Sequence, residues 1–178
     1  MEHARTVLTS DEMAYALTRM THEILERNHG ADGVTLLGLL TRGAPLAQRI
    51  ADIAAQQGHT LPVGRLDITM YRDDLRAQPT RPVGRTVLPG SIDGKVVVLV
   101  DDVLYSGRTV QAALHALADL GRPRAIQLVA LVDRGLRELP IQADVVGKHL
   151  PTARDERVRV AVRELDGEDL VTIERTAK

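Results

Sequence analysis

The sequence contains no cysteine, and its aromatic residues are three tyrosines. Without cysteine, the chain has neither a disulfide framework nor thiolate chemistry. With so few aromatic rings, it lacks the stacking platform on which single-stranded nucleic acids are usually held. The formal net charge of −1 at pH 7 gives no overall attraction for nucleic acid, so binding of that kind would need a local basic patch.

Long apolar runs are also missing. No stretch reaches the roughly 18 residues that cross a bilayer, and residues 1–5 lack the apolar core of a signal peptide, so we expect a cytoplasmic protein. The 178 residues, of which 44% are hydrophobic and 26% charged, predict a single globular domain (1–178) with a substantial core.

Strand and helix patterns alternate along the chain, which predicts an α/β fold with an open, mainly parallel sheet flanked by helices. The expected helices cover about 11–28, a segment that ends near 57, and 110–117; the expected strands cover 34–40, 63–70, 96–100, 125–132, 144–149, 157–162 and 169–174. Residues 134–160 are predicted to form a small C-terminal hood over the cleft.

The most informative stretch begins with the strand Val96–Val100, which ends abruptly in Asp101 and Asp102. A small polar loop follows, and Ser106 or Thr109 is the expected N-cap of the next helix. At the carboxyl end of a parallel strand, such a loop directs N–H groups and the helix dipole at an anion. Paired carboxylates suit sugar hydroxyls or a divalent cation. The segment therefore favours a sugar phosphate over a merely solvated acidic turn.

Two other segments are predicted to meet this loop. Thr41 and Arg42 follow the strand 34–40 and precede Gly43, so their N–H groups can face an anion. Residues 71–95 are rich in arginine and proline without a hydrophobic period, which favours a flexible lid with a hydrophilic insertion as the alternative. We expect Arg72 and Arg81 of this lid to contact a polyphosphate when it closes.

Residues 97–109 resemble the 5-phosphoribosyl-1-pyrophosphate (PRPP) signature of type I phosphoribosyltransferases. Together with 68–75 and 132–141, they make the chain similar to the PyrR family, in which a pyrimidine operon regulator is also a uracil phosphoribosyltransferase. The resemblance implies the type I phosphoribosyltransferase fold and conversion of uracil and PRPP to UMP and pyrophosphate. It also implies Mg²⁺, held mainly by PRPP with Asp101 and Asp102 as further candidate ligands, and a homodimer or higher homo-oligomer.

The resemblance also assigns roles to residues. Asp101, Asp102 and Arg72 are the expected catalytic residues. The expected PRPP and UMP site consists of Thr41, Arg42, Arg81, Asp101, Asp102, Val103, Leu104, Tyr105, Ser106, Gly107, Arg108 and Thr109. Arg134 and Val158 are expected at the uracil base.

The family's second activity is binding of pyrimidine operon messenger RNA, which uridine nucleotides such as UMP and UTP promote. The expected RNA contacts are Arg19, His22, Arg27, Arg137 and Lys148, because clustered cations suit RNA phosphates. The chain departs from the family pattern at Leu136 and Gln142, where the family usually has histidine and a basic residue.

Three alternatives remain open from the sequence. The first is a salvage phosphoribosyltransferase that does not bind RNA, and the second is an RNA-binding nucleotide sensor with little catalysis. The third, a phosphoacceptor signalling domain, would carry its acidic pair after the first strand rather than the third. The base is also open, because hypoxanthine, guanine or adenine would use the same PRPP loop.

Overall fold

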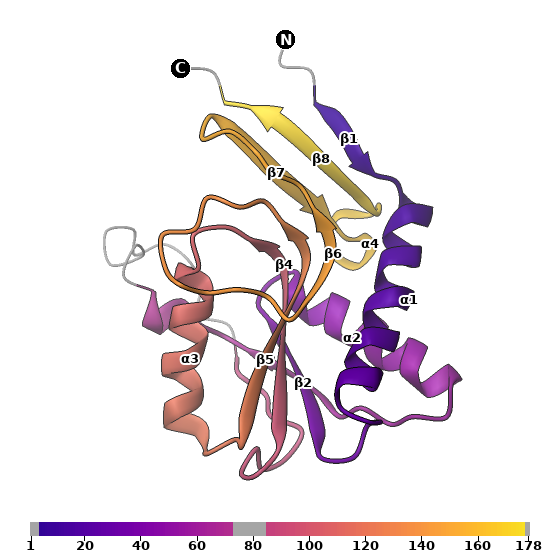
Figure 1. The fold of residues 1–178 in the computed structure, drawn as a ribbon, viewed down its shortest axis with the longest axis vertical. Helices are drawn as coiled ribbons and strands as arrows, with labels where there is room; N and C mark the ends of the chain where they lie inside the picture. Colours follow the sequence, from indigo (N-terminus) through magenta and orange to yellow (C-terminus); the bar gives the residue numbers. More distant parts are fainter. Residues whose placement is uncertain (1–3, 73–84, 177–178) are drawn as a thin grey trace.

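Two sheets form the framework of the protein (Figure 1). The computed structural model describes residues 4–72 and 85–176. The strands are β1 (Arg5–Leu8), β2 (Val34–Leu39), β3 (Val63–Leu66), β4 (Val96–Leu104), β5 (Ala125–Asp133), β6 (Val145–His149), β7 (Glu156–Ala161) and β8 (Leu170–Arg175). The helices are α1 (Ser10–Arg27), α2 (Gly43–Gln56), α3 (Arg108–Leu120) and α4 (Arg163–Asp166), with a 3₁₀ turn at Thr69–Tyr71.

The larger sheet has the strand order β3-β2-β4-β5-β6, and all of its pairs are parallel. Helices α1 and α2 cover one face and α3 covers the other (Figure 1). The chain leaves β2 through α2 toward β3 and leaves β4 through α3 toward β5, so it departs in opposite directions from two neighbouring strands. Such a switch point between strand ends is where ligands bind in open α/β sheets.

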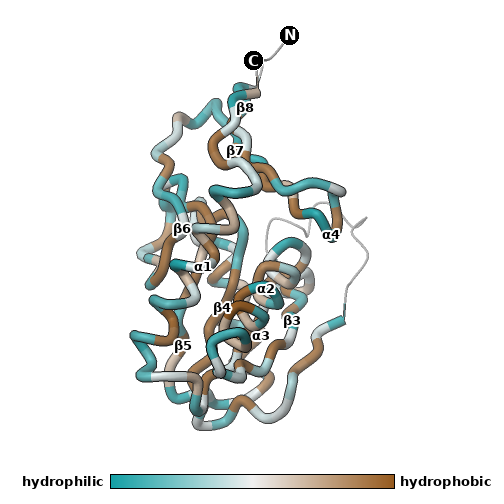
Figure 2. Tube along the Cα trace, turned by 90° about the vertical axis from the view of Figure 1, so that its right-hand side faces the viewer, coloured by the Kyte–Doolittle hydropathy of each residue, from teal (hydrophilic) through white to brown (hydrophobic). Residues whose placement is uncertain are grey.

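Strand β4 is the centre of the hydrophobic core. Val98 packs with the cluster beneath α1 and α2, whereas Val97 and Leu99 pack with the cluster beneath α3. Successive side chains of a strand point to opposite faces, so a strand covered by helices on both sides must be apolar throughout. Figure 2 shows β4 as a hydrophobic segment inside the molecule. The predicted fold class is confirmed.

Helix α1 begins with a capping box. The Thr9 hydroxyl accepts a hydrogen bond from the Glu12 N–H (3.3 Å), and the Glu12 carboxylate accepts one from the Thr9 N–H (2.8 Å). These reciprocal bonds satisfy donors that a helix start otherwise leaves without partners. The predicted helix 11–28 matches α1 to within one residue at each end.

The second sheet is antiparallel, with the order β1-β8-β7. Both ends of the chain therefore contribute to it, and they lie together in Figure 1. We call β1, β7, α4 and β8 the hood. The prediction of a hood at 134–160 is wrong in its boundaries, because β6 belongs to the parallel sheet and the N-terminal strand β1 had no clear sequence signal.

Three local predictions also need correction. The N-cap of α3 is Gly107, not Ser106 or Thr109, although the Ser106 hydroxyl accepts a hydrogen bond from the Arg108 N–H at 3.3 Å. The predicted strand 63–70 ends at residue 66. Residues 73–84 of the predicted lid, including Arg81, lie outside the described part of the chain. The end of that segment lies against the sheet, because Val87 pairs with Arg65 and Ile92 is buried. In the described ranges, no helix combines the length and apolar character needed to cross a bilayer.

Candidate active site

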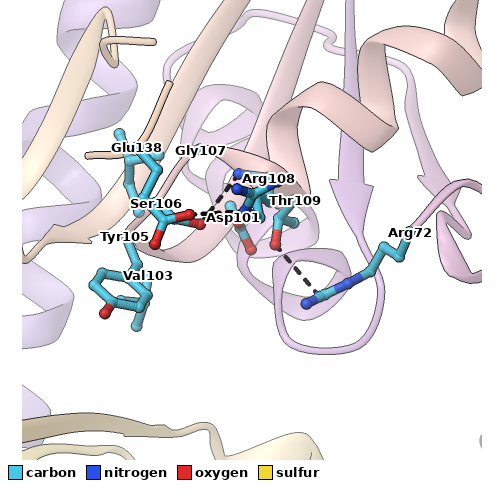
Figure 3. A pocket seen from close by; sticks show the side chains of 10 residues that line it. Arg72, Asp101, Val103, Tyr105, Ser106, Gly107, Arg108, Thr109 and Glu138 are labelled. Carbon is cyan, nitrogen blue, oxygen red and sulfur yellow. Dashed lines mark hydrogen bonds and ion pairs between the residues drawn. The ribbon is translucent and has the colours of Figure 1, made fainter. Parts of the chain in front are cut away.

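The loop after β4 encloses a cavity of about 330 Å³ at the switch point of the sheet (Figure 3). The residues that line it are Arg72, Asp101, Val103, Leu104, Tyr105, Ser106, Gly107, Arg108, Thr109 and Glu138. All of them except Glu138 were candidates from the sequence. Glu138 forms an ion pair with Arg108 at 2.8 Å, and nothing in the sequence pattern marks it.

The loop presents N–H groups to this cavity. Within the described residues, no protein acceptor faces the N–H groups of Ser106, Gly107 or Thr109. Gly107 adopts a φ of 94°, a left-handed conformation that glycine tolerates, and it starts the 13-residue helix α3. Amide donors and the positive end of a helix together form a ready anion site. A phosphate group therefore fits this loop.

Asp101 and Asp102 face two different cavities. Asp101 lines the loop cavity and is 7% exposed, and its carboxylate accepts a hydrogen bond from the Asp102 N–H at 2.9 Å. Burial, followed by the neighbouring charge of Asp102, raises the pKa of Asp101 well above its ordinary value, although Arg72 opposes this. Asp101 is thus suited to hold a proton, whereas Asp102 lines the second cavity.

The second cavity, of about 380 Å³, lies between the parallel sheet and the hood. It is lined by Arg42, Asp102, Arg157, Val158, Arg159, Val160 and Glu174. Three guanidinium groups against two carboxylates make its lining net positive. Three of these residues were candidates from the sequence, namely Arg42, Asp102 and Val158, whereas Arg157, Arg159, Val160 and Glu174 were not. The alternation of arginine and valine along 157–160 was the available signal.

Gly43 brings the loop after β2 close to the acidic pair. A Cβ atom on Gly43 would lie 2.2 Å from the Val100 carbonyl oxygen, so only glycine permits this approach of α2 to β4. The side chain of Arg42, directly before it, reaches the same cavity as Asp102. The structure therefore brings together the predicted loop at residues 41–42 and the predicted acidic pair. The Leu40–Thr41 peptide bond is cis.

Comparisons with known proteins agree with this geometry. Residues 3–161 match the family model described as "Phosphoribosyl transferase domain". The chain is 59% identical to the "Bifunctional protein PyrR" of Streptomyces coelicolor over 174 residues, which are 97% of this chain and 90% of that protein. It is 58% identical to the protein of the same name from Leifsonia xyli subsp. xyli over 176 residues, 96% of each. The chain belongs to the PyrR family of phosphoribosyltransferases. The predicted family and enzyme class are confirmed.

Solved structures support the fold of this PyrR-family chain. A hypoxanthine phosphoribosyltransferase from Trypanosoma cruzi superposes with a TM-score of 0.72 at 18% identity and covers 97% of each chain. One from Staphylococcus aureus gives a TM-score of 0.70 at 21% identity, covering 98% of this chain and 92% of that one. At these identities the likeness concerns the fold alone, so it does not select the base.

Arg134, a candidate base contact through its backbone or its side chain, uses its side chain in internal contacts. Its guanidinium stacks over the Tyr105 ring at 4.2 Å and donates hydrogen bonds to Thr152, Ala153 and Glu156. The residue is 7% exposed and lines neither of the two cavities described above. Its side chain therefore holds the segment 152–156 against the phosphate loop.

Arg137, a candidate RNA contact, instead makes three internal contacts. It donates hydrogen bonds to the carbonyl oxygens of Ile141 and Tyr105, each at 2.8 Å, and to the Asp133 carboxylate at 2.6 Å. These donors stabilise the base of the phosphate loop, and the contact of Arg137 with RNA stays a prediction.

The remaining RNA candidates lie on α1 and β6, which pack together. Arg19 donates to the carbonyl oxygens of Val146 and Gly147 and pairs with a glutamate one turn later, and Arg27 pairs with Asp144 at 3.4 Å. His22 contacts Gln57, and Lys148 is exposed. Arg19 and Arg27 therefore lie along the contact between α1 and β6, where Glu23 and Asp144 neutralise part of their charge.

The described residues include no group of three or more histidine, aspartate or glutamate side chains that could enclose a metal ion. Mg²⁺ is commonly held by one or two carboxylates together with substrate phosphates, rather than by a protein cage. Asp101 and Asp102 fit that arrangement, but they do not form a site by themselves.

Arg72 donates a hydrogen bond to Thr109 at 3.4 Å (Figure 3).

Proposed function

We propose that the protein transfers the phosphoribosyl group of PRPP to uracil, yielding UMP and pyrophosphate. The observation that carries this proposal is the acidic pair lying between an N–H-rich phosphate loop and an arginine-lined cavity. PRPP has the matching order of groups: a 5-phosphate, ribose hydroxyls and a diphosphate on the anomeric carbon.

This order places each part of the substrate. The 5-phosphate binds the N–H groups of residues 106–109 in the first cavity, and the ribose hydroxyls bind Asp101 and Asp102. The diphosphate and the base exchange places on the same carbon, so both belong in the second cavity. There Arg42 faces the diphosphate, and Val158 provides an apolar wall for uracil. Further expected diphosphate contacts are Thr41, Arg72 of the first cavity, and Arg81, which lies outside the described residues.

The chemistry follows from charge. When the C1–O bond to pyrophosphate breaks, negative charge grows on the leaving group and positive charge grows on the ribose. Arg42 stabilises the first and the Asp102 carboxylate stabilises the second, both from fixed positions in a partly desolvated cavity. Mg²⁺, held by PRPP with Asp101 and Asp102 as candidate ligands, would supply further neutralisation of the diphosphate.

The decisive experiment is a panel of bases with Mg²⁺ and PRPP, with release of pyrophosphate as the readout. We expect release with uracil and little with hypoxanthine, guanine or adenine. The variant D102N should stay folded but release pyrophosphate from PRPP and uracil about 10²-fold or more slowly than wild type. Faster turnover of any purine than of uracil would contradict the proposal.

We further propose that the protein binds pyrimidine operon mRNA when UMP or UTP is present, as a homodimer. The support is the bifunctional designation of its relatives and the cations gathered on α1 and β6. A gel shift against the leader transcript of pyrimidine genes, with and without UMP, tests this activity. K148A should weaken the complex with RNA. The control R124A, which replaces an exposed arginine directly before β5, should not. If wild type gives no UMP-dependent shift, the protein is a salvage enzyme only.

A further inference from the structure

The hood contacts the predicted diphosphate loop through an ion pair between Arg42 and Asp166. Arg42 Nη2 donates to Asp166 Oδ1 at 2.8 Å, and Nε donates to Oδ2 at 3.3 Å. Asp166 lies at the end of α4, and its Oδ2 also accepts a hydrogen bond from the Val162 N–H at 2.8 Å. The Asp166 carboxylate therefore accepts one hydrogen bond from the hood backbone and two from the Arg42 guanidinium, in a bidentate arrangement.

The pair is partly shielded from solvent, with side-chain exposures of 34% for Arg42 and 17% for Asp166. The Val162 N–H, followed by Arg42, holds the pKa of Asp166 below its usual range, so its carboxylate is ionised at neutral pH. A planar guanidinium that two parallel hydrogen bonds fix has little rotational freedom left.

Only one partner of the ion pair lines the second cavity. Arg42 is a lining residue, whereas Asp166 is not. A guanidinium carries five N–H donors, and the ion pair uses only Nε and one donor of Nη2. Asp166 thus leaves donors of Arg42 for an anion in the cavity.

We propose that Asp166 is a positioning residue: it orients Arg42 so that the free side of the guanidinium faces the diphosphate of PRPP. The inference rests on the proposed function, because the ligand of Arg42 is the diphosphate. It extends that function to a hood residue that does not touch the substrate. Through this contact, the hood sets the affinity for the diphosphate end of the substrate separately from the affinity for the 5-phosphate.

Glu164 offers a matched control on the same helix. It forms a similar bidentate pair with Arg49, at 2.8 and 2.6 Å, that lines neither cavity. We would compare wild type, D166N and E164Q by three measurements: the KM for PRPP, calorimetric titration with Mg²⁺–PRPP, and calorimetric titration with UMP, which has no diphosphate. Thermal unfolding would report the structural cost of each change.

In D166N, we expect PRPP to bind about tenfold more weakly, since one charge-assisted contact that orients Arg42 is lost. The affinity for UMP should stay within about twofold of wild type, and E164Q should match wild type for both ligands. If D166N does not fold, D166E replaces it, because glutamate keeps the charge on a side chain that is one methylene longer. D166E should also lose affinity for PRPP and not for UMP, but by a smaller factor than expected for D166N.

Three results would overturn the inference. The first is an equal loss for PRPP and UMP in D166N, which would indicate a structural role. The second is an equal loss for PRPP in D166N and E164Q. The third is tighter PRPP binding by D166N, which would mean that Asp166 competes with the diphosphate. A failure of the proposed function itself is distinguishable, because wild type would then form no UMP from uracil and PRPP.

Discussion

Replacing Arg137 with alanine tests whether this arginine supports the phosphate loop or faces RNA. Its three donors reach the carbonyl oxygens of Tyr105 and Ile141 and the carboxylate of Asp133. In R137A, the Asp133 carboxylate, whose side chain is 12% exposed, would keep the hydrogen bond from the Gly135 N–H at 3.0 Å. We expect both the stability of the fold and the affinity for UMP to fall.

The loss in the free energy of unfolding of R137A depends on the three acceptors that lose their hydrogen bonds from Arg137. A hydrogen bond to a charged group contributes about 1.5–3 kcal/mol, and the cost rises when a shielded carboxylate loses its partner. The contact with the Tyr105 carbonyl oxygen is exposed and that with the Ile141 carbonyl oxygen is partly buried, so water can replace part of what they lose, and we assign a loss of about 2–4 kcal/mol to R137A. The control E23Q, which removes the exposed pair with Arg19, should cost about 0.5 kcal/mol.

Urea denaturation measures both free energies of unfolding, and its pH dependence adds an independent check. Burial alone would raise the pKa of Asp133, but the hydrogen bonds from Arg137 and the Gly135 N–H outweigh it, so the pKa lies below its ordinary value. A depressed folded-state pKa contributes stability that is present above the unfolded pKa and is lost as the pH falls through the folded pKa. The gap between wild type and R137A should therefore shrink in acid. A loss below about 1 kcal/mol at neutral pH, as for an exposed arginine, would refute this reasoning.

Three further changes have distinct expected outcomes. D101N should become more stable relative to wild type as the pH rises above the ordinary aspartate range. The reason is that a raised folded-state pKa makes wild type lose stability between the unfolded and folded pKa values, as unfolding at several pH values would show. G107A should lose about 1–2 kcal/mol of stability and bind UMP at least tenfold more weakly, because φ is 94° and the new Cβ would meet Ile141 and Leu139 at 3.3–3.4 Å; titration with UMP checks this. T9A should cost about 1 kcal/mol in thermal unfolding and leave kcat unchanged, since neither Thr9 nor Glu12 lines either cavity.

The sequence predicted the parallel sheet and the phosphate loop because both depend on local patterns. The five β-branched or aliphatic residues Val96–Val100 predicted a strand covered on both faces, and the structure has β4 there, with the acidic pair near its end and the small polar loop after it. The family resemblance then assigned roles to the residues of this segment. Eight of the ten residues lining the first cavity were named in this segment, and Arg72 of the predicted lid was the ninth.

The boundaries of the hood and the arginine contacts could not be predicted, since they depend on pairing between distant parts of the chain. Strand β1 has four residues and gains its place only by pairing with β8, far along the sequence. An arginine on an expected surface has the same local signature whether it faces solvent or, like Arg137, donates three internal hydrogen bonds. The link between Arg42 and Asp166 joins residues 124 positions apart, so no local pattern marks it.

A crystal structure with bound UMP would show which loop of the protein holds the nucleotide phosphate. We expect the phosphate of UMP to receive hydrogen bonds from the N–H groups of residues 106–109, with the ribose hydroxyls on Asp101 and Asp102 and uracil beside Val158. A phosphate bound elsewhere, with the loop after β4 unchanged and without ligand, would contradict this expectation.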